Sequence, residues 1–361
     1  MAERAPLSLA AACRAAAAFV RGSCRLRPLG AGNINDTFLI EGTGDPLVLQ
    51  RISAAVFPRP ELVVENFALV SEHLQRRSAA EQLPIEVARP FATLAGPLYH
   101  RDEAGGYWRV QSYLPHSPRR QLTTPHQARR VGLTLATFHY LLADLPLHEK
   151  SALRDPLPGF HHLPGYLDEY RRAIAAWTGD TGGEEEECLT AINRYTPHCR
   201  ALQAAQESGL LPRQAVHGDP KIDNFLFTRS GDAIGLIDLD TVGGGLVVTD
   251  LGDCLRSGCN RAGEGGGAAP VEFDLALAGE LIAGYLQGPG GPPPAALRAA
   301  IFDGLLLVCL EVGLRFFTDY LRGNSYFKVT SPRDNLHRAL GQFRLSDVIA
   351  LQEPAIRRLA G

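Results

Sequence analysis

The feature that most constrains this chain is one short run near its middle, in which polar residues punctuate two apolar strands. The run reads VHGDPKIDNFLF and is followed, after the turn RSGD, by the second strand, AIGLID. Asp219 falls in the loop before the first strand, Asn224 stands where that strand begins, and Asp238 ends the second strand. Because a tight turn pairs two such strands as a hairpin, we expect Asp238 to return beside Asn224.

These three side chains suit the transfer of a phosphoryl group. That reaction needs a carboxylate to accept the proton of the attacking hydroxyl, and at least two oxygen ligands to hold Mg²⁺ on a nucleoside triphosphate. The spacing H-x-D-x-x-x-x-N, strand, turn, strand, D is that of the kinase catalytic loop and its metal-binding aspartate. We therefore predict Asp219 as the base and Asn224 and Asp238 as magnesium ligands. The alternative, that Asp219 only caps a turn before Pro220, explains one of these elements.

Further polar residues surround this motif. Lys221 is one of only three lysines among 36 basic residues, and we predict that its ammonium group stabilises the transferring phosphoryl group, the alternative being an ordinary surface lysine. His217 is predicted to hold the loop through backbone hydrogen bonds. Downstream, Asp240 is a candidate substrate contact, while Asp250 and Asp253 either extend the metal site or accept backbone hydrogen bonds that stiffen the loop.

The N-terminal part of the chain supplies a candidate nucleotide site. Residues 27–52 form two alternating runs joined by a Gly/Asp/Pro turn, which predicts a β-hairpin. Small residues at Gly30, Gly32 and Asn33 would let backbone N–H groups approach phosphates closely.

The returning strand of that hairpin ends in a cation. Arg51 stands where kinases place the lysine that pairs with the α- and β-phosphates. A carboxylate from the next helix should orient it, and we predict Glu65 for this part, with Glu72 as the reserve.

Periodicity predicts the fold class. A helix beginning near Ser8 explains the alanine-rich start better than a signal peptide, because Arg14 interrupts the apolar stretch. Before residue 115 the pattern is mainly extended around one helix, and afterwards it is mainly helical. We predict an α+β, two-lobed, protein-kinase-like fold, with a nucleotide-binding lobe at 1–114 and a catalytic and substrate-binding lobe at 115–361. The predicted helices are 60–77, 126–145, 163–177, 273–286, 295–321 and 334–345, the extended segments are 85–94, 96–101 and 107–114, and the predicted loops are 179–187, 262–269 and 288–294.

Length, charge and motifs exclude several classes. A chain of 361 residues exceeds the size of most single cores, and a net charge of -3 gives no broad attraction to nucleic acid. The seven cysteines form no C-x-x-C pair, so we expect reduced thiols and a cytoplasmic protein. No apolar run is long enough to span a membrane, and G-x-x-x-x-G-K-[ST] is absent, which disfavours a P-loop enzyme.

Several segments resemble one superfamily. HGDPKIDNFLF, IDLDTVGGGLVVTDLGD, GNINDTF, LQRI, RFFTDYLRGNSYFKV and NLHRALGQFRL are similar to the aminoglycoside phosphotransferase and choline kinase superfamily, and most of all to bacterial N-acetylhexosamine 1-kinases. The likeness runs from about residue 30 to residue 345. It implies a two-lobed kinase that uses ATP and Mg²⁺ to phosphorylate the anomeric hydroxyl of N-acetylglucosamine or N-acetylgalactosamine. It also implies that Arg315 and Tyr326, with Asp219, contact the sugar, and that Gln111 and Tyr113 contact the nucleotide.

Two alternatives stay open at this stage. The chain could phosphorylate another small acceptor, such as an aminoglycoside, an amino alcohol or another sugar, and the acidic segment GDTGGEEEE could then meet a cationic acceptor. It could also be a nucleotide-binding pseudokinase that acts as a scaffold, although such proteins usually lack the base or a metal ligand. Neither alternative involves a nucleic acid or membrane partner.

Overall fold

The computed structural model describes residues 9–29, 34–42, 44–115, 121–147, 153–263 and 271–361. The first lobe is built on a six-stranded antiparallel sheet in the order β1-β2-β3-β6-β4, with β5 also paired to β6. The strands are β1 (Arg25–Pro28), β2 (Asp36–Glu41), β3 (Leu47–Ile52), β4 (Pro90–Phe91), β5 (His100–Arg101) and β6 (Tyr107–Ser112).

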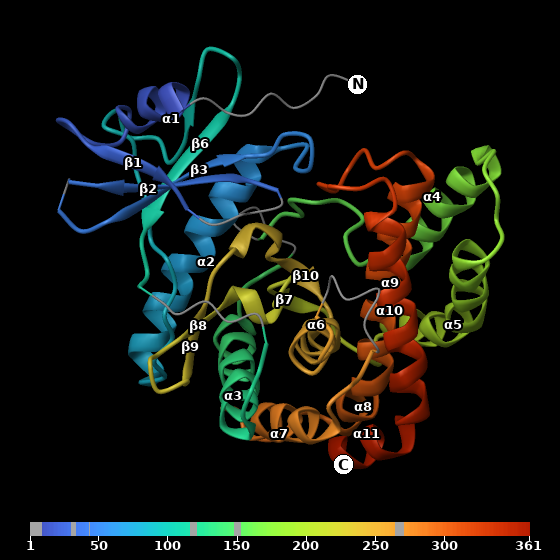
Figure 1. Cartoon of the computed structure of the whole chain (residues 1–361). Coiled ribbons are helices and arrows are strands. Elements are labelled where there is room, and N and C mark those ends of the chain that lie inside the picture. The colour runs from blue at the N-terminus through green and yellow to red at the C-terminus, as the bar shows by residue number, and fades with distance from the viewer. Residues whose placement is uncertain (1–8, 30–33, 43, 116–120, 148–152, 264–270) are drawn as a thin grey trace.

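A helix covers each face of this sheet (Figure 1). α1 (Leu9–Ala16) packs its alanines against the face that carries Phe38, Leu49 and Trp108. α2 (Pro60–Glu81) lies on the opposite face, where Phe67 stacks under the guanidinium of Arg109 at 4.9 Å. Side chains alternate between the faces of a strand, so neighbouring residues of β3 and β6 point to opposite sides of the sheet.

The second lobe is built on helices around one buried helix, α9 (Ile301–Leu321). It contacts α4, α5, α6 and α10, and Figure 1 shows it beside α10 at the right of the molecule. The other helices are α3 (Pro125–Leu142), α4 (Leu163–Ala176), α5 (Glu184–Glu207), α6 (Val247–Gly258), α7 (Leu275–Leu286), α8 (Ala295–Ala299), α10 (Asp334–Leu351) and α11 (Glu353–Ala360). In the described part of the chain, no helix is both long and apolar enough to cross a membrane.

Two short antiparallel pairs carry the central motif. β7 (Gln214–Val216) pairs with β10 (Gly243–Gly245), and β8 (Phe225–Phe227) pairs with β9 (Ala233–Leu236). Two 3₁₀ turns, η1 (Ile222–Asn224) and η2 (Leu239–Thr241), flank the second pair. β9 is also tied to the first lobe, because Glu86 forms a parallel bridge with Gly235.

The fold class is confirmed, as are both hairpins and the helices predicted at 60–77, 126–145 and 163–177. One prediction is wrong. The segment 179–187 is not a loop throughout, because its four glutamates open α5 and place negative charge at the helix N-terminus, where the macrodipole favours it. Asp250 and Asp253 lie on α6, from which Asp250 accepts backbone hydrogen bonds of the loop before Asp219, as one of the two predicted alternatives has it. The predicted loop at 262–269 falls largely outside the described residues, and the lobe boundary at residue 114 stays a prediction.

The contact between α3 and α7 yields a stability prediction. A Cβ at Gly132 would lie 2.0 Å from the carbonyl oxygen of Leu281, which is backbone and cannot rotate away. Replacing Gly132 by Ala should therefore force the helices apart and lower the free energy of unfolding by about 1 to 3 kcal/mol. Chemical denaturation measures this. Gly279→Ala on α7 is the matched control, because the added methyl group meets only the movable side chain of Leu359, at 3.2 Å.

Candidate active site

The loop between β7 and β8 gathers the predicted catalytic residues. Lys221 Nζ lies 2.5 Å from Asp219 Oδ2. The side-chain amide of Asn224 donates to the Asp219 carbonyl oxygen at 2.7 Å and lies 3.3 Å from Oδ2. Burial acts to raise the pKa of Asp219, but the charge of Lys221 and its hydrogen bond outweigh burial and lower that pKa. Asp219 is therefore ionised at neutral pH, as a proton acceptor must be.

One buried carboxylate holds this loop in place. Asp250 accepts hydrogen bonds from the backbone N–H of His217 at 2.7 Å and of Gly218 at 2.9 Å, and its side chain also meets His139 Nε2 at 2.9 Å. Gly218 has a φ of +86°, and a Cβ there would lie 2.8 Å from the Thr241 carbonyl oxygen, so the position requires glycine. Asp250 thereby fixes the two residues that precede Asp219.

His217 has the structural part that the sequence predicted. It is fully buried, and burial lowers its pKa, so the ring is neutral. Its Nε2 donates to the Ile237 carbonyl oxygen at 3.0 Å, and its Nδ1 accepts from the Asp219 backbone N–H at 3.3 Å. The imidazole thus links the catalytic loop to the strand end that carries Asp238.

Asp238 is brought to the same site by the hairpin. The Ile237 backbone N–H donates to the Asn224 carbonyl oxygen at 2.9 Å, which places the next residue beside Asn224. Asp238 has a φ of +64°, a left-handed conformation that costs energy for a residue with a side chain and that occurs often at functional sites. Its side chain keeps open surface, yet the surrounding protein, and then the Asp240 carboxylate, raise its pKa to about 7.

These residues fit a divalent cation. Among the described residues, no donor hydrogen-bonds to the Asp238 carboxylate, and neighbouring negative charges disfavour its ionised form. The Asn224 amide nitrogen is engaged by Asp219, so its carbonyl oxygen is the atom available to a ligand. Carboxylate and amide oxygens are the ligands that Mg²⁺ takes in proteins. Asn224 and Asp238 therefore suit Mg²⁺, as the motif predicted.

Asp240 has a different role from the predicted one. It is 3% exposed, forms an ion pair with Arg109 at 2.5 Å, and accepts a hydrogen bond from Asn35 Nδ2 at 2.6 Å. Arg109 in turn donates to Gln50 Oε1 at 2.7 Å. Both partners of Asp240 belong to the first lobe, so this carboxylate joins the lobes, and its predicted contact with substrate is not supported.

The predicted partnership of Arg51 and Glu65 is wrong. Glu65 forms an ion pair with Arg154. Arg51 pairs in register with Trp108, on the α1 side of the sheet, and its charge acts on Asp102. Arg109 is the cation that faces α2 and Asp240.

The other predicted nucleotide contacts are placed as follows. Gln111 shares the Arg109 face of β6, and the Tyr113 backbone N–H donates to the Pro46 carbonyl oxygen at 3.2 Å. Gly30, Gly32 and Asn33 lie outside the described residues. The reserve residue Glu72 is on α2. The roles of all these residues, and of Arg51, in nucleotide binding stay predictions.

Arg315 of α9 is surrounded by rings. Its guanidinium lies 5.4 Å from the centre of Phe160, 5.7 Å from Tyr166, 5.8 Å from Tyr326 and 5.6 Å from Phe327, an arrangement we call the Arg315 cage. Burial acts to lower the pKa of Arg315, but electrostatic interactions with Tyr166, Tyr326 and Asp219 outweigh burial and raise that pKa. Arg315 is thus close enough to Asp219 for their charges to interact.

The loop that carries Tyr326 is held by Asp319, at the C-terminal end of α9. The Asp319 carboxylate accepts from the backbone N–H groups of Ser325 and Tyr326, each at 2.8 Å, and of Phe327 at 2.9 Å. Asn335 of α10 donates to the same carboxylate at 2.9 Å. Asp319 therefore fixes the backbone of the segment that carries Tyr326 and Phe327.

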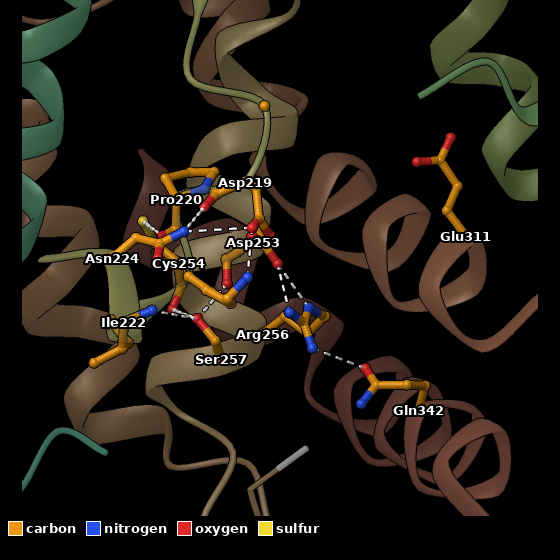
Figure 2. A network of polar contacts seen from close by, with 12 residues as sticks. Asp219, Pro220, Ile222, Asn224, Asp253, Cys254, Arg256, Ser257, Glu311 and Gln342 are labelled. Carbon is orange, nitrogen blue, oxygen red and sulfur yellow. Dashed lines mark hydrogen bonds and ion pairs between the residues drawn. The ribbon is translucent and has the colours of Figure 1, made fainter. Parts of the chain in front are cut away.

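A network on α6 supports the loop from below (Figure 2). Asp253 is buried and pairs with Arg256 at 2.7 Å, and Arg256 reaches Gln342 of α10 at 3.3 Å. Ser257 accepts from the Ile222 backbone N–H at 3.2 Å. Asp253 therefore acts as a structural ion pair beside the loop, and it is not placed as a metal ligand.

Sequence reasoning missed several residues of this site. Arg109 had a signal, because it is a charged residue between the apolar Trp108 and Val110 in the run YWRVQ. Asn35 lies in the segment NINDT that carried the resemblance. His161 and Glu311, which meet near Gly218, are 150 residues apart, and no local pattern connects them.

Comparison with known proteins decides the family. The sequence profile of the phosphotransferase enzyme family, APH, matches residues 25–299. The chain belongs to this family. The family match and the motif together make it a small-molecule phosphotransferase, as the sequence predicted at the level of the superfamily.

The phosphotransferase has relatives with several acceptors. A curated homoserine kinase from Hyphomonas neptunium is 30% identical over 204 residues, which is 56% of this chain and 54% of that protein, so the alignment spans about half of the relative. A microcompartment-associated aminopropanol kinase has a similar structure, with a TM-score of 0.66 and 15% identity. The match covers 97% of this chain and 98% of that protein. A choline/ethanolamine kinase family protein from Mesorhizobium loti has a TM-score of 0.55 and 20% identity, and the match covers 93% of this chain and 91% of that protein. These distant structures support the fold alone.

The Asp250 contacts yield a testable prediction. In Asp250→Asn, an amide N–H₂ would face either a backbone N–H or His139, so a buried donor would lose its acceptor. We expect the free energy of unfolding to fall by about 2 to 4 kcal/mol, as measured by denaturant titration. Asp232→Asn, at the partly exposed turn of the β8–β9 hairpin, is the control and should change it by less than about 1 kcal/mol. Equal effects would contradict the part given to Asp250.

Proposed function

We propose that this phosphotransferase moves the γ-phosphoryl group of ATP, held by Mg²⁺, onto the anomeric hydroxyl of an N-acetylhexosamine. The observation that carries the proposal is the gathering of Asp219, Asn224 and Asp238 by the β8–β9 hairpin and the loop before it, with Arg315 close enough to interact with Asp219. The first three supply the chemistry, and the fourth marks the side from which an acceptor would approach.

The proposed step is an in-line displacement. The acceptor oxygen forms a bond to the γ-phosphorus, the bond from that phosphorus to the β,γ-bridging oxygen breaks, and ADP leaves. Asp219 takes the hydroxyl proton, and Lys221 lies at its carboxylate, where its charge also favours the phosphoryl group. Asn224 and Asp238 would hold Mg²⁺, whose chemistry when bound is to neutralise phosphate charge.

The Arg315 cage supports a neutral polyhydroxy acceptor. A guanidinium surrounded by four rings offers forked hydrogen-bond donors and flat apolar faces, and a sugar presents hydroxyl oxygens and C–H faces to match them. A cationic acceptor would meet the like charge of Arg315. The anomeric hydroxyl is also more acidic than other sugar hydroxyls, so a carboxylate with a lowered pKa suffices as the base.

The acidic segment offers little to a cationic acceptor. Glu184 pairs with Arg333 at 2.6 Å, Glu187 pairs with Arg344 at 2.7 Å, and Glu185 accepts from the Tyr320 hydroxyl at 2.7 Å. These glutamates tie α5 to α9 and α10 and are already partnered. The pseudokinase alternative is disfavoured because base and metal ligands are all present.

A second candidate function is the phosphorylation of homoserine. It is favoured by the similarity to the Hyphomonas neptunium homoserine kinase. Arg315 could then bind the amino acid carboxylate in a bidentate pair. ATP as donor and the free cysteines support a cytoplasmic location for either activity.

The base assignment is tested by Asp219→Asn. An amide cannot accept the hydroxyl proton, so we expect the turnover number to fall at least about a hundredfold, while calorimetry still detects Mg²⁺-dependent ATP binding. Asp223→Asn, at a neighbouring exposed aspartate, is the control. Turnover close to that of the unaltered protein in Asp219→Asn would remove the base assignment.

The acceptor is tested by assaying ADP release with N-acetylglucosamine, N-acetylgalactosamine, homoserine, aminopropanol and ethanolamine. We expect turnover with an N-acetylhexosamine, and Arg315→Met should raise the KM for that acceptor about tenfold or more, with the KM for ATP unchanged, because a charge-assisted contact is lost. Turnover with homoserine alone would favour the second candidate. Magnesium-dependent ATP binding without turnover of any of these acceptors, or of a wider set of sugars, would favour the pseudokinase alternative.

A further inference from the structure

His161 connects two parts of the site that come from distant regions of the chain. It stands just before α4, and its Nδ1 lies 2.8 Å from Glu311 Oε2 on α9. Its Nε2 lies 2.7 Å from the carbonyl oxygen of Gly218, the residue before Asp219. One imidazole therefore joins the helix that carries Arg315 to the loop that carries the proposed base.

The partners of His161 define its protonation. A carboxylate and a carbonyl oxygen both accept hydrogen bonds, so both ring nitrogens must donate, and only the imidazolium does this. Burial acts against the charge, but the hydrogen bond and the negative charge of Glu311 raise the pKa of His161 to about 9. The ring is therefore charged at neutral pH.

Two features of the pair of His161 and Glu311 lower the stability of the folded state. His161 has a φ of +54°, a left-handed conformation that is strained for a residue with a side chain. Glu311 is 1% exposed, and its second oxygen, Oε1, has no hydrogen-bond partner in the described part of the chain. A buried oxygen without a partner destabilises the folded state and calls for a reason other than stability.

The geometry around the pair supplies that reason. Glu311 and Arg315 are one turn apart on α9, so they lie on the same face of the helix. The charges of both act on Tyr166, a ring of the Arg315 cage. Glu311 thus marks the acceptor side of the site, and Gly218 marks the base side.

We propose that His161 is a positioning residue, which through Glu311 and the Gly218 carbonyl fixes the place of Asp219 relative to the acceptor held at the Arg315 cage. This rests on the proposed function, because it assumes an acceptor at that cage. A small displacement between a base and its hydroxyl lowers the rate of proton transfer, so this link acts on turnover more than on nucleotide binding. Two carboxylates act on His161, Glu311 from α9 and Asp250 from α6. The other charged or titratable groups beside it are Tyr166 from α4 and Arg315 from α9.

The test uses the full chain with His161→Gln and Glu311→Gln, and with His162→Gln as the matched control, since His162 is exposed and only caps α4. We expect kcat with the acceptor to fall about tenfold to a hundredfold in the first two variants, with the KM for ATP unchanged. The double variant should be no worse than the poorer single one, because both substitutions break one link. Losses that multiply, or a loss in the control as large as in His161→Gln, would overturn the proposal.

A pH profile separates positioning from a purely structural part. The raised pKa of His161 means that its contribution to kcat is complete at neutral pH and is lost as the pH rises through about 9. Glu311→Gln removes the main cause of the raised pKa, so this alkaline loss should move to lower pH, and in His161→Gln it should be absent. Unchanged profiles in both variants would overturn the proposal.

Hydrogen exchange makes the result independent of the acceptor. In folded His161→Gln and Glu311→Gln, the backbone amides of residues 217–219 should exchange faster than in the unaltered protein, while those of α7 should not. If no N-acetylhexosamine is turned over but this difference is present, the proposed function fails and the link from His161 to the loop stands. Equal exchange at residues 217–219 would sink the link itself.

Discussion

The rest of the site depends on a single buried carboxylate that accepts two successive backbone N–H groups. Asp250 sits on a helix of the second lobe, and its two oxygens receive the amides of His217 and Gly218 at 2.7 and 2.9 Å. Burial acts to raise its pKa, but hydrogen bonds from His139 and the loop lower it, so the charge is kept. An ionised group that is buried away from water makes short, directional hydrogen bonds. A loop held in this way positions its next residue, Asp219, without further support from local sequence.

Two carboxylates two residues apart then separate into different tasks. Asp240 pairs with Arg109 and accepts a hydrogen bond from Asn35, and it joins the two lobes. Asp238 receives no such donor from the described residues, and its negative neighbour raises its pKa to about 7. The protein has thus satisfied one charge internally and left the other for a cation to satisfy. Asp238 stands in a left-handed conformation just before the turn η2, and Asp240 lies within that turn.

What could be predicted from the sequence was local. The β8–β9 hairpin brings Asn224 and Asp238 together by its own turn chemistry, and the helix periods fixed the fold class. The partners of Arg51 and Asp240 could not be found in this way, because they depend on which face of a strand meets another lobe. A shift of one residue along β3 or β6 reverses that face, and Arg109 rather than Arg51 points to Asp240. His161 and Glu311 were missed for a related reason, since only tertiary packing brings them together.

Helix α9 carries three polar residues of the candidate site along one of its faces. Glu311, Arg315 and Asp319 are spaced by four residues and so rise along one face, one turn apart. Glu311 reaches the catalytic loop through His161, Arg315 occupies the cage, and Asp319 holds the loop that bears Tyr326. The loop after α9 is held mainly through its backbone, because the amides of Ser325, Tyr326 and Phe327 donate to the Asp319 carboxylate. Because these bonds come from the backbone, they do not depend on the side chains at Tyr326 and Phe327, so under the proposed function the acceptor contact at Tyr326 and the position of Asp219 are set by separate interactions.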